Sequence, residues 1–310
     1  MSILVAADFT PGEWADWMAA LARALPGETL LRERGTQPDA IDVAIVANPP
    51  RGALEGLPGL LLVQSLWAGV EKLLDDPTVP AHVPLARMVD PAMNEAMAET
   101  ALWAVLSLQR DAFDYARQQQ ARHWAQHAQR GARDVTVAVL GLGQMGRAVA
   151  LRLARNGHCV VGWSAHPAPL EGVETRAGDA ALPGVLRAAQ IVVNLLPLTP
   201  STRGLFDAGT FALMPRDASL VNLARGAHVV EADLLAALDD GRLRHAVLDV
   251  FATEPLPPAH AFWSHPKVTV LPHVAAQTDP RSAAAVAATN VAALRSRRPL
   301  AHLVDRARGY

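Results

Sequence analysis

The sequence contains almost no cysteine. Cys159 is the one cysteine among 310 residues, which excludes an intramolecular disulfide framework and a cysteine-rich zinc site. Because it lies in an apolar run, we expect a small buried thiol rather than a nucleophile. Lysine is scarce too: Lys72 and Lys267 are the only two, and arginine supplies the other basic side chains. We interpret this bias as genome composition rather than function.

Long apolar runs and a strong net charge are also absent. Apolar runs such as 60–63 are far too short to cross a bilayer, and the first residues lack the basic start of a secretory signal. We therefore expect a cytoplasmic protein that does not associate with membranes. A net charge of −2 and an isoelectric point near 6.6 provide no electrostatic basis for binding nucleic acid.

What the chain does contain is enough apolar material for a large core. Hydrophobic residues make up 51% and charged residues 19%, which is typical of a well-buried globular protein. A length of 310 residues exceeds the size at which a single core usually stops growing. We therefore expect two domains.

A glycine-rich turn lies near the middle of the chain. The apolar run 137–140 is followed by Gly141, Gly143 and Gly146 in the spacing G-x-G-x-x-G, and then by a pattern that suits a helix. In this context Gly141 permits a tight turn, Gly143 lets the backbone approach a pyrophosphate, and Gly146 lets the helix pack closely on the strand. The motif predicts a dinucleotide site, and the alternative is a glycine-rich turn that binds nothing.

The pattern on both sides of this turn predicts an α/β fold. Up to about residue 95, apolar strands alternate with helices, which predicts a small parallel sheet. Residues 95–126 predict one long helix. We expect Trp103, Phe113, Tyr115 and Trp124 along it to be packing residues. After the turn, six predicted strands match a doubly wound parallel sheet of the Rossmann type, and a helix that ends at Arg295 is expected to return to the first domain. The six strands cover 137–140, 159–163, 191–195, 219–223, 246–249 and 268–271.

Polar residues follow several of these strands. Arg225 comes after one strand, Asp249 and Glu254 after the next, and His273 after the last. The carboxyl ends of parallel strands meet at one edge of a sheet, where ligands bind. We therefore expect a cation, two acids and a histidine to converge beside the glycine turn. The alternatives are a salt bridge between strands for Arg225 and a loop cap for Glu254.

These segments resemble a known family. Asn222-Leu-Ala-Arg225-Gly, Leu248-Asp-Val-Phe with Glu254-Pro, and Pro272-His273-Val-Ala are similar to signatures of the D-isomer-specific 2-hydroxyacid dehydrogenases. The resemblance covers nearly the whole chain. It implies an NAD(P)-binding domain over 97–282 and a smaller, flavodoxin-like substrate domain formed by 1–96 with 283–310. The implied activity is the reduction of small 2-oxo acids, such as glyoxylate or hydroxypyruvate, to 2-hydroxy acids.

The resemblance also implies roles for individual residues. His273 would be the general acid, Glu254 would orient it and favour its protonated form, and Arg225 would hold the substrate carboxylate with its planar fork. The loop of Trp67, Ala68, Gly69 and Val70 would supply backbone N–H groups to the same carboxylate, with an ordinary glycine turn as the alternative. The implied cofactor contacts come from Gly141, Gly143, Gln144, Met145, Gly146, Ser164, Leu196, Pro197 and Asp249, of which Asp249 would contact the nicotinamide carboxamide.

The choice between NAD(H) and NADP(H) depends on the end of the second strand. An acid about twenty residues past the glycines would favour NAD, but the sequence there is Trp163-Ser164-Ala165-His166. Nothing repels a 2′-phosphate, so NADP(H) is favoured over NAD(H). The sequence departs from the family pattern at two places: Ala165 and His166 stand where arginines are expected, and Asn48 stands where an aromatic is expected to help close the substrate site.

Other functions explain less of the sequence. A cofactor-sensing binding protein related to transcriptional corepressors would share the fold, whereas a methyltransferase would leave Arg225, Glu254 and His273 unexplained. His123 and His127, four residues apart on the predicted long helix, could bind a metal, but we find no acid spaced to join them and expect no metal site. The long helix and the family resemblance favour a homodimer.

Overall fold

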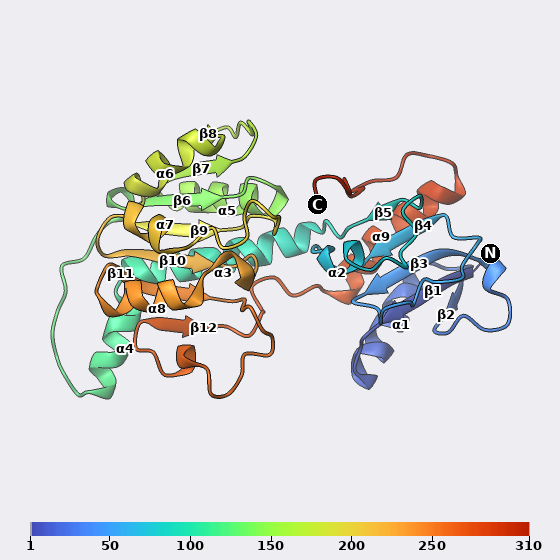
Figure 1. The fold of residues 1–310 in the computed structure, drawn as a ribbon, viewed down its shortest axis with the longest axis horizontal. Coiled ribbons are helices and arrows are strands. Elements are labelled where there is room, and N and C mark those ends of the chain that lie inside the picture. The colour runs from blue at the N-terminus through green and yellow to red at the C-terminus, as the bar shows by residue number, and fades with distance from the viewer. Residues whose placement is uncertain (1, 310) are drawn as a thin grey trace. The chain divides into compact units, whose positions relative to one another are not determined.

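The computed structural model of the chain describes residues 2–309. They form two compact units, residues 2–93 with 278–309, and Asn94–Gln277 (Figure 1). Each unit contains one parallel sheet with helices packed on it. The expectation of an α/β fold with a Rossmann-type sheet is confirmed.

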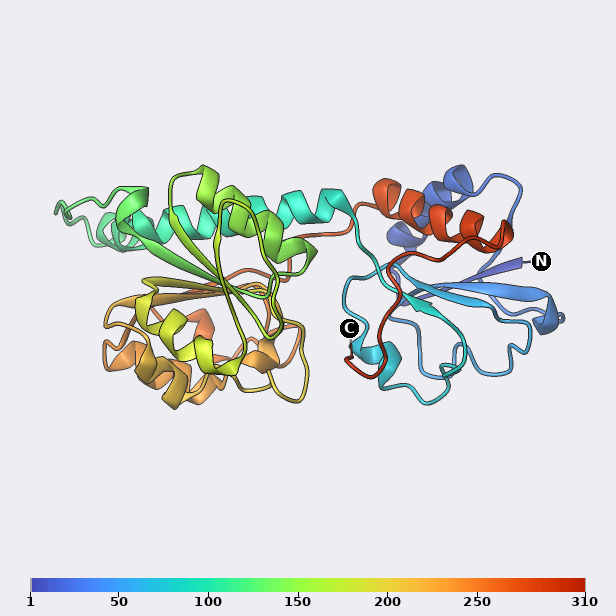
Figure 2. The same cartoon turned by 90° about the horizontal axis from the view of Figure 1, so that it is seen from above.

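The first unit has a five-stranded sheet in the order β2-β1-β3-β4-β5. Helix α1 (Pro11–Ala24) begins with a capping box, in which the Thr10 side chain accepts a hydrogen bond from the Glu13 N–H and the Glu13 carboxylate accepts one from the Thr10 N–H. The C-terminal helix α9 (Pro280–Arg295) packs against α1 on one face of the sheet, as expected (Figure 2). The remaining elements are β1 (Ser2–Ala7), β2 (Thr29–Leu31), β3 (Ile41–Ala47), β4 (Leu62–Ser65), α2 (Glu71–Leu74) and β5 (Leu85–Ala86).

The second unit has a seven-stranded parallel sheet in the order β12-β11-β10-β9-β6-β7-β8. Its strands are β6 (Thr136–Leu140), β7 (Cys159–Ser164), β8 (Glu174–Ala177), β9 (Ile191–Asn194), β10 (Ala218–Asn222), β11 (Leu243–Leu248) and β12 (Val268–Val270). Six of them match the predicted strands. The seventh, β8, is a partly exposed edge strand with charged residues, so it lacks the apolar run that identifies a buried strand.

Helices cover both faces of this sheet (Figure 2). Residues of α3 and α5 share one apolar cluster with the sheet, and residues of α6, α7 and α8 share the other. Strands buried on both faces are near-continuous apolar runs, which is why most of them could be recognised in the sequence. The helices are α3 (Pro91–Gln109), α4 (Ala112–Gln120), α5 (Gln144–Arg155), α6 (Leu182–Ala188), α7 (Ala208–Leu213) and α8 (Glu231–Asp239).

The prediction of a single long helix over 95–126 is wrong. Helix α3 ends at Gln109, and α4 starts only after Asp111, whose φ of 58° is left-handed. Arg244 on β11 forms ion pairs with both Asp111 and Asp114, which holds the chain in this turn. Helical periodicity continues across the break, but the ion pairs that favour the break come from a distant strand.

Two further expectations are corrected. Cys159 is exposed because it is the first residue of β7, and its Sγ donates to the Arg133 carbonyl. Trp124 follows the end of α4 and is 92% exposed, so it is not a packing residue within this chain. Among the described residues, no helix is long and apolar enough to span a membrane.

His245 on β11 makes stability depend on pH. Its ring stacks on Phe113 with centroids 4.4 Å apart, and its Nε2 lies 2.9 Å from the Thr269 hydroxyl. Burial, together with the nearby charge of Arg117, lowers the pKa of His245 from 6.5 to about 4. Between these values the unfolded chain binds the proton more strongly than the folded chain, so stability present above pH 6.5 is lost as the pH falls towards 4.

We expect this loss to be on the order of 3 kcal/mol. Urea unfolding of the wild type and of His245→Leu at several pH values measures it. The variant should show a flatter dependence of the unfolding free energy across the same window, and parallel curves would contradict the assignment.

Candidate active site

The glycine turn joins β6 to α5 at the edge of the second sheet where the strands end. Gly141 has a φ of 98°, and a Cβ at this position would lie 2.6 Å from the Leu195 carbonyl oxygen, in the loop after β9. A Cβ at Gly146 would lie 1.7 Å from the Gly141 carbonyl oxygen. Both glycines are therefore required by close backbone contacts within the protein.

Gly143 is different from the other two glycines. It is the N-cap of α5 with an extended backbone, and a Cβ there would meet no protein atom within 4 Å. No contact within the protein explains why this residue is a glycine, so the space beside it suits the close approach of a ligand. Gln144 and Met145 follow as the first residues of α5, whose amide groups and helix dipole favour an anion at this end. The turn therefore fits a dinucleotide pyrophosphate.

Glu254 and His273 form a hydrogen-bonded pair at the same edge. His273 Nδ1 lies 2.7 Å from Glu254 Oε2, and Glu254 Oε1 accepts a hydrogen bond from the Phe251 N–H. Because a carboxylate only accepts, Nδ1 carries the proton and Nε2 is left for another partner. The two side chains are 35% and 54% exposed, so both remain open to solvent-borne molecules.

The pair favours charge on both members. The hydrogen bond to Glu254 raises the pKa of His273 against the opposing effect of burial. Burial would raise the pKa of Glu254, but the hydrogen bonds from His273 and Phe251 outweigh it and lower that pKa. The arrangement favours the protonated imidazole, as a general acid requires.

Arg225 lies between the glycine turn and this pair in strand order, just after β10. It precedes a short 3-10 helix, Gly226–His228, and its Nη1 donates to the Ala224 carbonyl at 2.6 Å. A Cβ at Gly226 would lie 1.9 Å from the Phe251 carbonyl carbon, so the loops after β10 and β11 are in direct backbone contact. The glycine that follows Arg225 in the sequence is the residue that allows this contact.

Asp249 is buried and holds the backbone on the C-terminal side of His273. Its carboxylate accepts hydrogen bonds from the N–H groups of Val274, at 2.7 Å, and Ala275, at 3.0 Å. His273 itself has a left-handed φ of 56°, and its N–H donates to the Asp249 carbonyl. Left-handed backbone is unfavourable outside glycine and persists where the surroundings impose it. The predicted contact between Asp249 and the nicotinamide stays a prediction.

Ser164 is the last residue of β7, at the position predicted to meet the adenine ribose. Its hydroxyl donates to the His166 carbonyl within the loop that follows. His166 and Ala165 are exposed, and no acid lies in this turn. The loop thus presents hydroxyl, amide and imidazole groups without a negative charge.

The loop Trp67–Val70 belongs to the first unit and follows β4. Ser65 Oγ accepts from the Trp67 N–H and donates to the Trp67 carbonyl, both at 3.0 Å, while the ring of Trp67 packs edge-on against Phe9 and Trp17. Within residues 2–309, no acceptor is found for the N–H groups of Ala68, Gly69 and Val70. These three amides are chemically suited to an anion.

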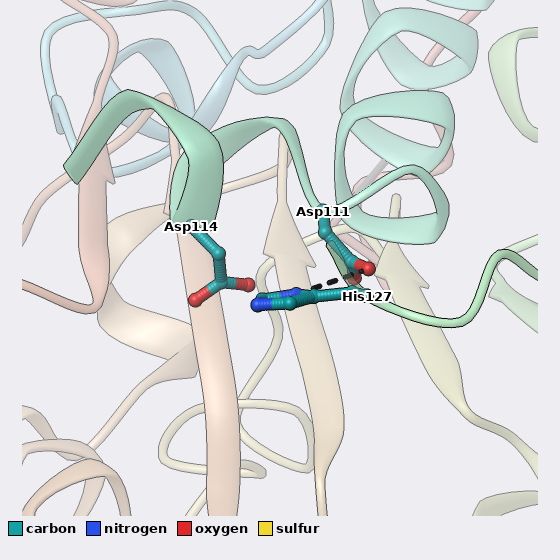
Figure 3. A group of neighbouring side chains, drawn as sticks. All are labelled: Asp111, Asp114 and His127. Atoms are coloured by element: carbon teal, nitrogen blue, oxygen red, sulfur yellow. Dashed lines mark ion pairs between the residues drawn. The ribbon is translucent and has the colours of Figure 1, made fainter. Parts of the chain in front are cut away.

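One cluster has metal-ligand chemistry but lies elsewhere in the second unit. Asp111, Asp114 and His127 converge there, with His127 Nδ1 3.4 Å from Asp111 Oδ2 (Figure 3). The prediction that no acid joins His127 is wrong, because Asp111, the N-cap of α4, and Asp114 in its first turn lie beside it. His123 and His127 both follow the end of α4, so they do not share a helix. Arg244, however, already pairs with both aspartates, and Arg117 pairs with Asp114, so two arginines neutralise the two carboxylates without a metal ion.

The sequence reasoning missed the buried polar residues that connect the loops of the site. Asn194 and Asn222, at the ends of β9 and β10, are fully buried and bonded to each other through Nδ2 and Oδ1 at 2.9 Å. His228 is equally buried. Asparagine at the end of an apolar strand is the only local signal for such a connection.

Comparison with known proteins identifies the family. The family model described as "D-isomer specific 2-hydroxyacid dehydrogenase, NAD binding domain" matches residues 102–275. This chain belongs to that family. It is therefore an NAD(P)-dependent dehydrogenase, and a methyltransferase or a corepressor-like protein is not supported. A relative named glyoxylate/hydroxypyruvate reductase A, from Yersinia enterocolitica, is 39% identical over 303 residues, which cover 96% of this chain and 97% of the relative.

Solved structures of family members share the fold over the full length. A D-isomer-specific 2-hydroxyacid dehydrogenase from Xanthobacter autotrophicus Py2, in complex with NADPH and MES, is 40% identical with a TM-score of 0.94, covering 100% of this chain and 99% of that one. An NADPH-dependent glyoxylate/hydroxypyruvate reductase from Sinorhizobium meliloti, in complex with NADP and sulfate, is 37% identical with a TM-score of 0.93 and covers 100% of both chains.

The contrast between Gly143 and Gly146 gives a paired prediction for the predicted pyrophosphate turn. Gly143→Ala should leave the melting temperature close to that of the wild type, because its methyl group meets no protein atom, but should weaken dinucleotide binding at least about tenfold. Gly146→Ala should destabilise the protein by about 3 kcal/mol through collision with the Gly141 carbonyl. Thermal unfolding and cofactor titration measure the two effects, and unchanged cofactor affinity in Gly143→Ala would place the pyrophosphate elsewhere.

Proposed function

We propose that the protein reduces small 2-oxo acids of the glyoxylate and hydroxypyruvate type to 2-hydroxy acids, with NADPH preferred over NADH. The observation that carries this proposal is the His273–Glu254 pair at 2.7 Å, on the same sheet edge as Arg225 and the glycine turn. The names of the Yersinia and Sinorhizobium relatives support the same substrate class.

His273, Arg225 and Glu254 would have different roles in the reaction. When bound, the reduced nicotinamide supplies a hydride to the carbonyl carbon of the oxo acid. His273 donates a proton from Nε2 to the carbonyl oxygen, because Nδ1 is held by Glu254. Arg225 binds the carboxylate and carbonyl oxygens through its planar guanidinium. Glu254 stabilises the imidazolium before transfer and keeps the ring oriented.

The loop Trp67–Val70 of the first unit would also bind a carboxylate. Its three consecutive N–H groups suit a carboxylate, and Trp67 adds an apolar wall. Asn48 follows β3 with a left-handed φ of 45°. With an amide there instead of an aromatic ring, we infer that substrates with polar tails, such as hydroxypyruvate, are accepted more readily than bulky apolar ones.

NADPH preference is inferred from the loop after β7. Gly141, Gly143, Gln144, Met145, Gly146, Leu196 and Pro197 would hold the parts that both cofactors share. Ser164 and His166 would decide between the cofactors, since no carboxylate repels a 2′-phosphate there. Structures of relatives in complex with NADPH or NADP support this inference. A homodimer and a cytoplasmic location stay predictions, and light scattering would measure the first.

Steady-state kinetics test the function directly. We expect the purified protein to oxidise NADPH with glyoxylate and hydroxypyruvate, with a lower kcat/KM for NADH and for an oxo acid with a bulky apolar tail. Replacing Ser164 and His166 together with alanine should reduce the advantage of NADPH over NADH. A large NADH preference in the wild type would refute the cofactor proposal, and no turnover with any oxo acid would refute the function.

The Glu254–His273 pair predicts the pH dependence of reduction. The pKa of His273 is raised, so the imidazolium is fully present below that pKa and is lost as the pH rises through it. The rate should therefore be constant at lower pH and fall on the alkaline side. Glu254→Gln removes the main cause of the shift, so the fall should move to lower pH. Profiles of kcat/KM for both proteins measure this, and coincident profiles would contradict the role of Glu254.

A further inference from the structure

We propose that His228 is a positioning residue, which fixes the backbone of Arg225 against the loop that carries Leu196 and Pro197. The inference rests on the proposed function, because it assigns Arg225 to the substrate. It concerns a fully buried imidazole that takes no part in the chemistry described above.

Both ring nitrogens of His228 face carbonyl oxygens. Nδ1 lies 3.1 Å from the Arg225 carbonyl oxygen, and Nε2 lies 3.3 Å from that of Pro197. Carbonyls only accept, so the ring must donate: a neutral ring donates to one of them, and an imidazolium donates to both. In either state the ring spans the two loops that follow neighbouring strands β9 and β10.

The Arg225 carbonyl is the point where these contacts converge. Besides the His228 ring, it accepts hydrogen bonds from Asn222 Nδ2 at 2.9 Å and from the backbone N–H of His228 at 3.3 Å. Asn222 is bonded in turn to Asn194, whose Oδ1 accepts from the Leu196 N–H at 3.2 Å. Two buried routes thus connect the backbone of Arg225 to the Leu196–Pro197 loop.

These hydrogen bonds affect the position of Arg225 more than they affect the free energy of unfolding. A single buried hydrogen bond contributes little net free energy, and an apolar side chain would fill the same space. A displacement of about 1 Å in a group that orients the substrate, however, can cost on the order of a hundredfold in rate. A buried polar ring at this place is therefore best explained by the precision it imposes on Arg225.

Three variants separate the two ring contacts. His228→Leu removes both. His228→Asn places an amide near the position of Nδ1 and keeps a donor for the Arg225 carbonyl, whereas His228→Gln reaches towards the position of Nε2 and the Pro197 carbonyl. His245→Leu is the matched control, because it removes another buried imidazole of the same unit that contacts Thr269 rather than the site.

We expect His228→Leu to lower kcat/KM for the 2-oxo acid by about 10- to 100-fold, mainly through KM. His228→Asn should recover most of this loss and His228→Gln less, while His245→Leu should keep wild-type constants. Wild-type constants in His228→Leu would overturn the proposal. If His228→Leu does not fold, equal constants for the Asn and Gln variants would overturn it instead.

Hydrogen exchange gives a readout that is independent of turnover. Amides of residues 223–230 should exchange faster in His228→Leu than in the wild type, and faster than in His245→Leu. Unchanged exchange in these amides would overturn the positioning role. If the wild type reduces no 2-oxo acid, the proposed function fails, and the exchange comparison still decides whether His228 holds the backbone of Arg225.

Discussion

The parallel arrangement of the second sheet is the constraint on which the site depends. Because every strand runs in the same direction, each one delivers the loop that follows it to the same edge. In strand order from β12 to β7, that edge carries His273, Asp249, Arg225, the Leu196–Pro197 loop, the glycine turn and Ser164. Close backbone contacts at Gly141 and Gly226 then fix the loops against their neighbours. Functional side chains that are more than a hundred residues apart in the sequence therefore lie in one row along this edge.

The charges of Glu254 and His273 at this edge are stabilised by a short hydrogen bond between two partly exposed side chains. Glu254 and His273 favour each other's charged forms, while Arg225 favours the carboxylate and opposes the imidazolium. The hydrogen bond of 2.7 Å is the largest influence on His273 and decides the direction of its shift. Proton donation requires a protonated imidazole whose Nε2 can reach the substrate, whereas cofactor binding alone does not require one. The geometry therefore fits the proposed proton donation, which the fold alone does not indicate.

The sequence could predict features that local patterns determine. Apolar runs marked six strands of the second sheet, since strands buried on both faces carry few polar residues, and the glycine spacing marked the turn. The roles of Arg225, Glu254 and His273 came from motifs and stay predictions. Features set by distant partners could not be predicted. The break between α3 and α4 depends on Arg244, more than a hundred residues away, and β8 is an exposed edge strand without an apolar signal. The structural contacts of His228 likewise became visible only when the loops after β9 and β10 were brought together.

The polar residues buried behind the site explain how an edge made of loops can be well defined. Loops ordinarily have more freedom than the elements they connect, but Asn194, Asn222 and Asp249 are almost completely inaccessible and their hydrogen-bonding groups are used on neighbouring loop backbones. A buried polar group is costly unless its partners are in place. Any arrangement of the loops that separates these partners is therefore disfavoured. The same free-energy cost that makes such groups rare in cores restricts Arg225 and His273 to narrow ranges of position, as a reaction that transfers a hydride and a proton to adjacent atoms requires.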